Sequence, residues 1–106
     1  MTYKYFTMLV SEYINNGSNT EKLLGEIGYP ADLDLEPEQL IKTVDIVAAA
    51  ADGNIKQLID ISGISAAAFS REYAIPYRTI QDWCSGQRRP AEYIPRMIAY
   101  AMIGNM

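Results

Sequence analysis

Apolar residues recur along this chain at steps of three and four, the spacing of a helix that lies with one face on a core. Phe6, Leu9 and Tyr13 form the first such stripe, within an expected helix over residues 3–15. No segment alternates convincingly between apolar and polar residues at the two-residue period of a half-buried strand. The pattern therefore predicts an all-α fold.

Capping and turn residues divide this pattern into seven expected helices. A capping box over residues 18–21 opens the second helix, which runs to Ile27, and Pro37 suits the first turn of the third. After a stop at Asp52-Gly53-Asn54, four short helices follow with brief connections. The other six expected helices cover residues 3–15, 37–51, 55–61, 65–73, 76–84 and 91–103, with a loop over 31–36.

Charge divides the chain near residue 52. Residues 1–52 carry three lysines and nine acidic residues, a net charge of −6. Residues 53–106 carry five arginines and one lysine against four acidic residues, a net charge of +2. Because a partner responds to the local field of one face, the total of −4 does not exclude nucleic acid as a partner. We expect an acidic helical portion, 1–52, followed by a more basic portion, 53–106.

The stretch from Ile64 to Pro90 reads as two short helices joined by a tight turn. Five apolar residues are placed to bury a face between them: Ala68, Phe69, Ile75, Ile80 and Trp83. With that face buried, the second helix exposes four polar side chains: Tyr77, Arg78, Gln81 and Asp82. Arginine pairs bidentately with guanine and glutamine with adenine. The second helix therefore has the residues of a recognition helix that reads bases in the major groove.

This segment resembles the Cro/CI-type helix-turn-helix family of phage repressors, the xenobiotic-response-element-like regulators. The matching residues are Ile64-Ser65, Phe69, Ile75, Arg78-Thr79-Ile80, Trp83 and the run from Ser85 to Pro90. That run, Ser-Gly-Gln-Arg-Arg-Pro, completes the family's Trp-x-x-Gly-x-Arg-x-Pro pattern from Trp83. The resemblance covers about residues 54–103 and implies that the portion 53–106 is a helix-turn-helix DNA-binding domain. It implies a repressor-like transcriptional regulator that binds specific sequences of double-stranded DNA.

The resemblance also implies which side chains meet DNA. The base-reading residues would be Tyr77, Arg78 and Gln81 on the second helix of the pair. The phosphate-contacting residues would be Ser65, Gln87, Arg88 and Arg89, and we add Lys56 as a further cation of the same portion. A single short recognition helix rarely supplies enough specificity, so a homodimer is expected.

The final helix carries more apolar surface than one contact with a core requires. One stripe holds Ile94, Met97, Ile98, Ala101 and Met102, and another side holds Tyr93, Arg96 and Tyr100. The helices of 1–52 are also too apolar to stand free in water. We therefore expect self-association through 1–52 and the final helix.

Two departures from the family pattern keep a second interpretation open. Ala66 stands where the family usually has glutamine, and Asp82 places an acid near the expected groove. The alternative is a protein-interaction module on a helix-turn-helix fold, such as the antitoxin of a toxin–antitoxin pair. In that case residues 1–52 would bind a basic protein partner.

Other residue types narrow the function classes. The chain has no histidine, so a serine or cysteine nucleophile lacks its usual base, and we expect no enzyme. The acidic run 32–36 lacks the glycine and glutamate of a calcium loop, and no cofactor or metal is expected. The single Cys84 indicates a reducing cytoplasm. No apolar run approaches the ~20 residues that span a bilayer, so no membrane partner is expected.

Overall fold

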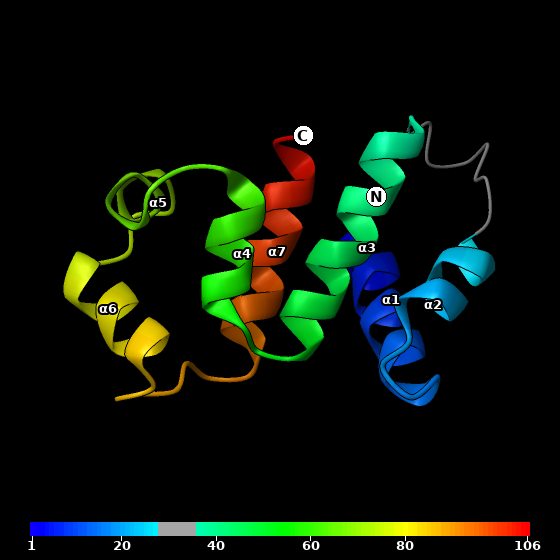
Figure 1. Cartoon of the computed structure of the whole chain (residues 1–106), viewed down its shortest axis with the longest axis horizontal. Coiled ribbons are helices and arrows are strands. Elements are labelled where there is room, and N and C mark those ends of the chain that lie inside the picture. The colour runs from blue at the N-terminus through cyan, green and yellow to red at the C-terminus, as the bar shows by residue number, and fades with distance from the viewer. Residues whose placement is uncertain (28–35) are drawn as a thin grey trace.

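A computed structural model describes residues 1–27 and 36–106. The described residues form helices and no strand, which confirms the all-α prediction. The helices are α1 (Tyr3–Asn15), α2 (Thr20–Ile27), α3 (Pro37–Ala51), α4 (Ile55–Ser62), α5 (Ala66–Glu72), α6 (Tyr77–Ser85) and α7 (Tyr93–Gly104) (Figure 1). The helices α1 and α3 to α7 begin and end within two residues of the bounds that the sequence predicted for them. The loop expected over 31–36 lies outside the described residues, apart from Glu36.

Helix α3 is the centre of the molecule. It contacts α1 and α2 on one side and α4 and α7 on the other (Figure 1). The helix buries side chains on several sides. Its buried residues are Leu40, Thr43, Val44, Ile46, Val47, Ala49 and Ala50, and Ala48 and Ala51 are half-buried. One hydrophobic cluster runs through α3 from Phe6 to Phe69, so both portions of the chain share a core.

Capping residues explain where two of the helices begin. The backbone N–H of Lys22 donates to Asn19 Oδ1 at 3.1 Å, so Asn19 caps α2. The sequence placed this cap at Ser18, but Ser18 has a φ of 59°, whereas an N-cap residue has extended backbone. Helix α3 starts with Pro37 at its first turn, as predicted, and the backbone N–H of Glu36 donates to Gln39 Oε1 at 3.0 Å.

Helices α1 and α7 lie against each other through aromatic rings. The rings of Tyr3 and Tyr100 meet edge to face with centroids 5.2 Å apart, and the Tyr100 hydroxyl donates to the Met1 carbonyl at 2.8 Å. The predicted apolar stripe of α7 is divided by this packing: Ile98 and Met102 are buried, but Met97 and Ala101 are exposed. The last helix therefore keeps an apolar strip on the surface.

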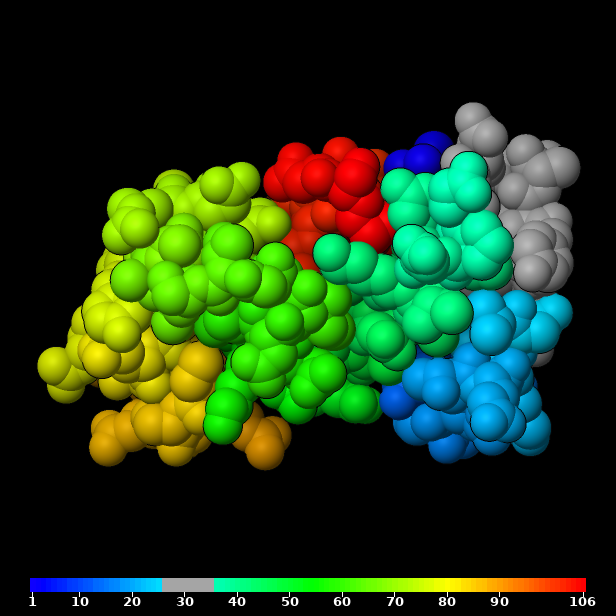
Figure 2. Space-filling model, turned by 45° about the horizontal axis from the view of Figure 1, so that its top comes forward, coloured from blue at the N-terminus to red at the C-terminus, as the bar shows by residue number. Residues whose placement is uncertain are grey.

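The molecule is elongated, with extents of 40 × 26 × 20 Å. Helices α5 and α6 form one end, and α1 and α2 form the opposite end (Figures 1 and 2). None of the described helices is long and apolar enough to cross a membrane.

Candidate nucleic-acid interface

Helices α5 and α6 pack together as the sequence predicted for the pair. The Ser65 hydroxyl accepts a hydrogen bond from the backbone N–H of Ala68 at 3.1 Å, which caps α5. Phe69 and Ile80 are fully buried, and Ile75 and Trp83 are half-buried against the core. Ala68, which was expected to be buried between the two helices, is half-buried. Ala66 also packs against the core, which the sequence did not predict.

A left-handed residue makes the turn between the two helices. Ala74 has a φ of 53°, and the backbone N–H of the next residue, Ile75, donates to the Ser70 carbonyl at 2.9 Å. Pro76, with φ −54°, then leads directly into α6. For a residue with a Cβ atom the left-handed conformation costs about 1–2 kcal/mol. This turn sets the direction of α6 against α5.

The outer face of α6 carries the expected base-reading side chains. Tyr77 and Gln81 are exposed, and the Arg78 side chain is 84% exposed. Ile80 faces the opposite way and is fully buried, so packing fixes the rotation of the helix about its axis. Asp82 was expected to be exposed with these residues, and that prediction is wrong: its side chain is only 19% exposed.

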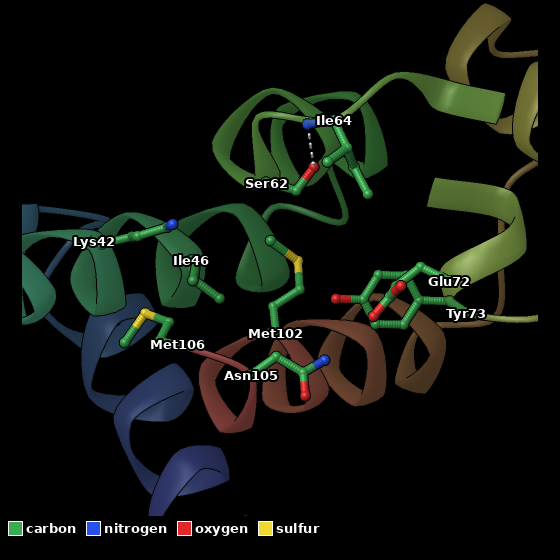
Figure 3. Close-up of a pocket in the computed structure, with 9 residues that line it drawn as sticks. All are labelled: Lys42, Ile46, Ser62, Ile64, Glu72, Tyr73, Met102, Asn105 and Met106. Carbon is green, nitrogen blue, oxygen red and sulfur yellow. Dashed lines mark hydrogen bonds between the residues drawn. The ribbon is translucent and has the colours of Figure 1, made fainter. Parts of the chain in front are cut away.

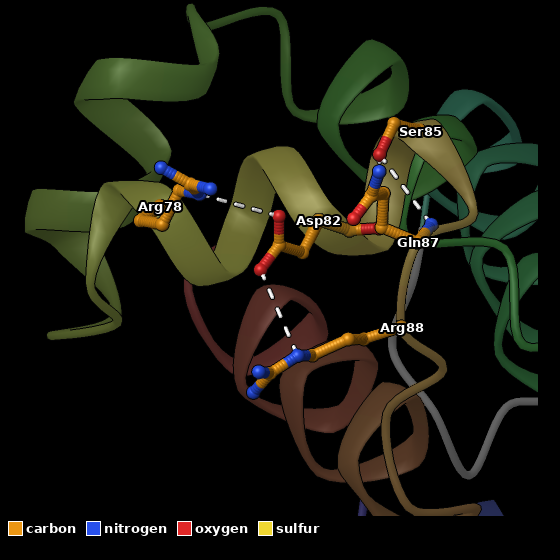
Figure 4. Close-up of polar contacts among 5 residues, drawn as sticks. All are labelled: Arg78, Asp82, Ser85, Gln87 and Arg88. Atoms are coloured by element: carbon orange, nitrogen blue, oxygen red, sulfur yellow. Dashed lines mark hydrogen bonds and ion pairs between the residues drawn. The ribbon is translucent and has the colours of Figure 1, made fainter.

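Asp82 lies between two arginines (Figure 4). Its Oδ1 is 3.4 Å from Arg78 Nε, one turn earlier on α6, and its Oδ2 is 4.0 Å from Arg88 Nε, in the loop that follows. The loop is held to the end of α6 by its backbone, because the Arg88 N–H donates to the Asp82 carbonyl at 3.3 Å. One carboxylate thus joins an expected base-reading arginine to an expected phosphate-contacting one.

The end of α6 is shaped by a second left-handed residue. Gly86 has a φ of 82°, which glycine adopts without steric cost, and it turns the chain at the helix C-terminus. The Ser85 hydroxyl donates to the Asp82 carbonyl at 3.2 Å and accepts from the backbone N–H of Gln87 at 3.4 Å. This turn presents Gln87, Arg88 and Arg89 as exposed residues directly after α6.

A groove brings Lys56 to the same arginines. It has a volume of about 590 Å³ and lies between the turn before α4, the end of α6 and the loop before α7. Lys56, Arg88 and Arg89 line it together with the acidic residues Asp52 and Glu92. Three of the five expected phosphate-contacting residues therefore share one hollow. Ser65 lies elsewhere, at the start of α5, where its hydroxyl caps that helix.

Cys84 lies in the wall of this groove. Burial raises the pKa of its thiol, the positive charge of Lys56 lowers it by a smaller amount, and Asp60 raises it. The thiolate is therefore disfavoured near neutral pH, which lowers the reactivity of Cys84 as a nucleophile. Within the described part of the chain, no three side chains of the metal-binding types gather into a site.

A second, smaller hollow of about 260 Å³ lies on another part of the molecule (Figure 3). Its floor holds the buried residues Ile46 and Met102, and Lys42 and Glu72 stand on opposite sides of it. Burial raises the pKa of the Tyr73 hydroxyl, and the Asn105 side chain lowers it by a smaller amount. The residues that line this hollow include none of the expected DNA-contacting residues.

Searches of family models, of curated proteins and of solved structures find no match to the chain.

Proposed function

We propose that this protein is a sequence-specific double-stranded DNA-binding transcriptional regulator, repressor-like, in which α6 enters the major groove. One observation carries the proposal: a short helix is held by a buried face while Tyr77, Arg78 and Gln81 stand exposed on its other side. Two exposed arginines, Arg88 and Arg89, follow it directly. Such a helix places side chains at base edges while flanking cations hold phosphates.

The charge of the half that holds α6 supports the same orientation. Residues 53–106 carry a net charge of +2, whereas residues 1–52 carry −6. Helices α1 and α2 lie at the end opposite to α6 (Figure 1) and account for −1 of that −6. A duplex at α6 would then meet mainly residues of the basic half. The chain as a whole stays acidic, which limits its attraction to nucleic acid in general.

A homodimer is part of the proposal. The exposed apolar strip on α7 contains Tyr93, Met97 and Ala101. Pairing of two such strips would bury apolar surface that one copy leaves in water. To act on DNA, the dimer must place its two copies of α6 roughly 34 Å apart, in successive major grooves. The free Cys84 thiol suits a reducing cytoplasm, where such a regulator would work.

Binding to a pool of random duplexes, followed by sequencing of the retained DNA, tests the proposal directly. Lys56, Arg78, Arg88 and Arg89 give about four cationic contacts per protomer, so the log–log dependence of affinity on salt should have a slope of about −3 to −4. Absence of duplex binding at low salt, or an affinity that does not respond to salt, would contradict the proposal.

Substitutions separate base reading from phosphate contact. Arg78→Ala and Gln81→Ala should change which sequences are preferred and cost about 1–3 kcal/mol on the best site. Arg88→Ala and Arg89→Ala should weaken all duplexes alike. Arg71→Ala, which removes an exposed arginine at the end of α5, is the matched control and should change neither property. Identical behaviour of the two pairs across a sequence panel would show that α6 is not the recognition helix.

The second candidate is a protein-interaction module, for which antitoxins of toxin–antitoxin pairs are the model. The observation in its favour is that Asp82 forms ion pairs with Arg78 and Arg88, two of the arginines that would contact DNA. In addition, Met8, Ile14 and Ile41 are exposed apolar residues on the acidic portion. A basic partner protein that binds residues 1–52, together with failure to bind any duplex, would favour this candidate.

A further inference from the structure

We propose that Asp82 determines how strongly the protein discriminates its operator from other DNA. By holding Arg78 and Arg88, its carboxylate weakens the attraction of both arginines to phosphate and favours the contact of Arg78 with base edges. The inference rests on the proposed DNA-binding function and concerns the same surface.

The contacts of Asp82 hold the arginines without covering them. Each arginine meets the carboxylate through Nε, at 3.4 Å for Arg78 and 4.0 Å for Arg88. These distances are longer than the ~2.7–2.9 Å of a bidentate arginine–carboxylate pair. The side chains of Arg78 and Arg88 are 84% and 81% exposed, so a ligand can reach both.

The position of the carboxylate is fixed more firmly than that of the arginines. Asp82 lies within α6, its side chain is mostly buried, and its backbone carbonyl accepts from both the Ser85 hydroxyl and the Arg88 N–H. A phosphate that approaches Arg78 or Arg88 therefore also approaches this negative charge. Arg78, Arg88 and Asp82 together carry a net charge of +1, whereas the two arginines alone would carry +2.

Phosphates and bases respond differently to that charge. Binding to random DNA is essentially electrostatic, so a fixed carboxylate beside the cations lowers it directly. A base edge is neutral and offers acceptors, so it meets the guanidinium without the same repulsion. Because its Nε contacts Asp82, the Arg78 side chain already has less rotamer freedom before DNA binds, so it loses less conformational entropy when it pairs with a base. Both effects raise the ratio of operator affinity to random affinity.

Asp82→Asn tests the inference, because it removes the charge and preserves the size of the side chain. The affinity for random duplex should rise about two- to tenfold, the range that two exposed ion pairs represent. The salt dependence should become steeper, and the ratio of best-operator to random affinity should fall.

Asp45→Asn is the matched control. Asp45 is an exposed aspartate on α3 that does not line the groove of Lys56, Arg88 and Arg89, and the substitution changes the net charge by the same amount. It should leave the ratio of operator to random affinity unchanged. An equal fall of this ratio in both variants would overturn the inference, since the effect would then come from net charge alone.

A measurement without DNA separates the inference from the function on which it rests. The Nε–Hε NMR signals of Arg78 and Arg88 should shift in Asp82→Asn and stay in place in Asp45→Asn. Signals that do not move in Asp82→Asn overturn the inference whatever the DNA result. Failure of both the wild-type chain and Asp82→Asn to bind any duplex overturns the proposed function. Binding by both, with unchanged affinity and ratio, overturns the inference alone.

Discussion

Ala74 holds the turn between α5 and α6 in a conformation that suits glycine, so Ala74→Gly should stabilise the protein. Its φ of 53° lies in the left-handed region, where a Cβ atom costs about 1–2 kcal/mol. Ala74 is exposed, so removal of its methyl group gives up little buried apolar surface. Glycine gives the unfolded chain more conformational entropy than alanine does, and the loss of this entropy on folding offsets about 0.4–1 kcal/mol of the gain. The expected net stabilisation is therefore about 0.5–1 kcal/mol.

Thermal unfolding followed by circular dichroism measures this effect. For a chain of this size, the expected stabilisation corresponds to a rise in Tm of about 2–6 °C. Ala67→Gly is the matched control, because Ala67 lies within α5 in ordinary helical conformation and glycine there should destabilise by about 1 kcal/mol. A loss of stability in Ala74→Gly similar to that of Ala67→Gly would refute the assignment of strain to this turn.

Three further predictions concern the core, the dimer and the thiol. Phe69→Ala should destabilise the fold by about 3–5 kcal/mol, because Phe69 is fully buried, and denaturant unfolding will show whether it does. If the proposed dimer pairs through α7, Met97→Glu should give a monomer in light scattering without loss of stability, since Met97 is 55% exposed; Ile64→Glu, also at an exposed apolar residue, should leave the proposed dimer intact. Because burial raises the pKa of Cys84, its contribution to stability is complete below the thiol pKa of the unfolded chain, about 8.5, and is lost as pH rises through the higher folded value. Tm measured from pH 7 to pH 10 should therefore fall less in Cys84→Ala than in the wild-type chain.

The sequence by itself determined the helices and the exposed positions of Tyr77, Arg78 and Gln81 on α6, but not the position of Asp82. Caps, breakers and apolar spacing act within a few residues, so Pro37 and the turn at Gly53 mark helix ends wherever the helices pack. The i to i+4 spacing of Arg78 and Asp82 likewise allows an ion pair on one helix without any tertiary contact. Local physical chemistry was therefore enough for the all-α fold and for the exposed position of Arg78 and Gln81.

Only the tertiary structure decided how distant residues meet. Helix α3 is buried on several sides because α1, α2, α4 and α7 all pack on it, and apolar spacing cannot tell how many neighbours a helix has. Lys56 shares a groove with Arg88 and Arg89 because α4 packs against α6. Asp82 reaches Arg88 because the left-handed turn at Gly86 brings the loop back to α6. These contacts depend on directions taken by the chain after each helix, which residue spacing along the sequence does not contain.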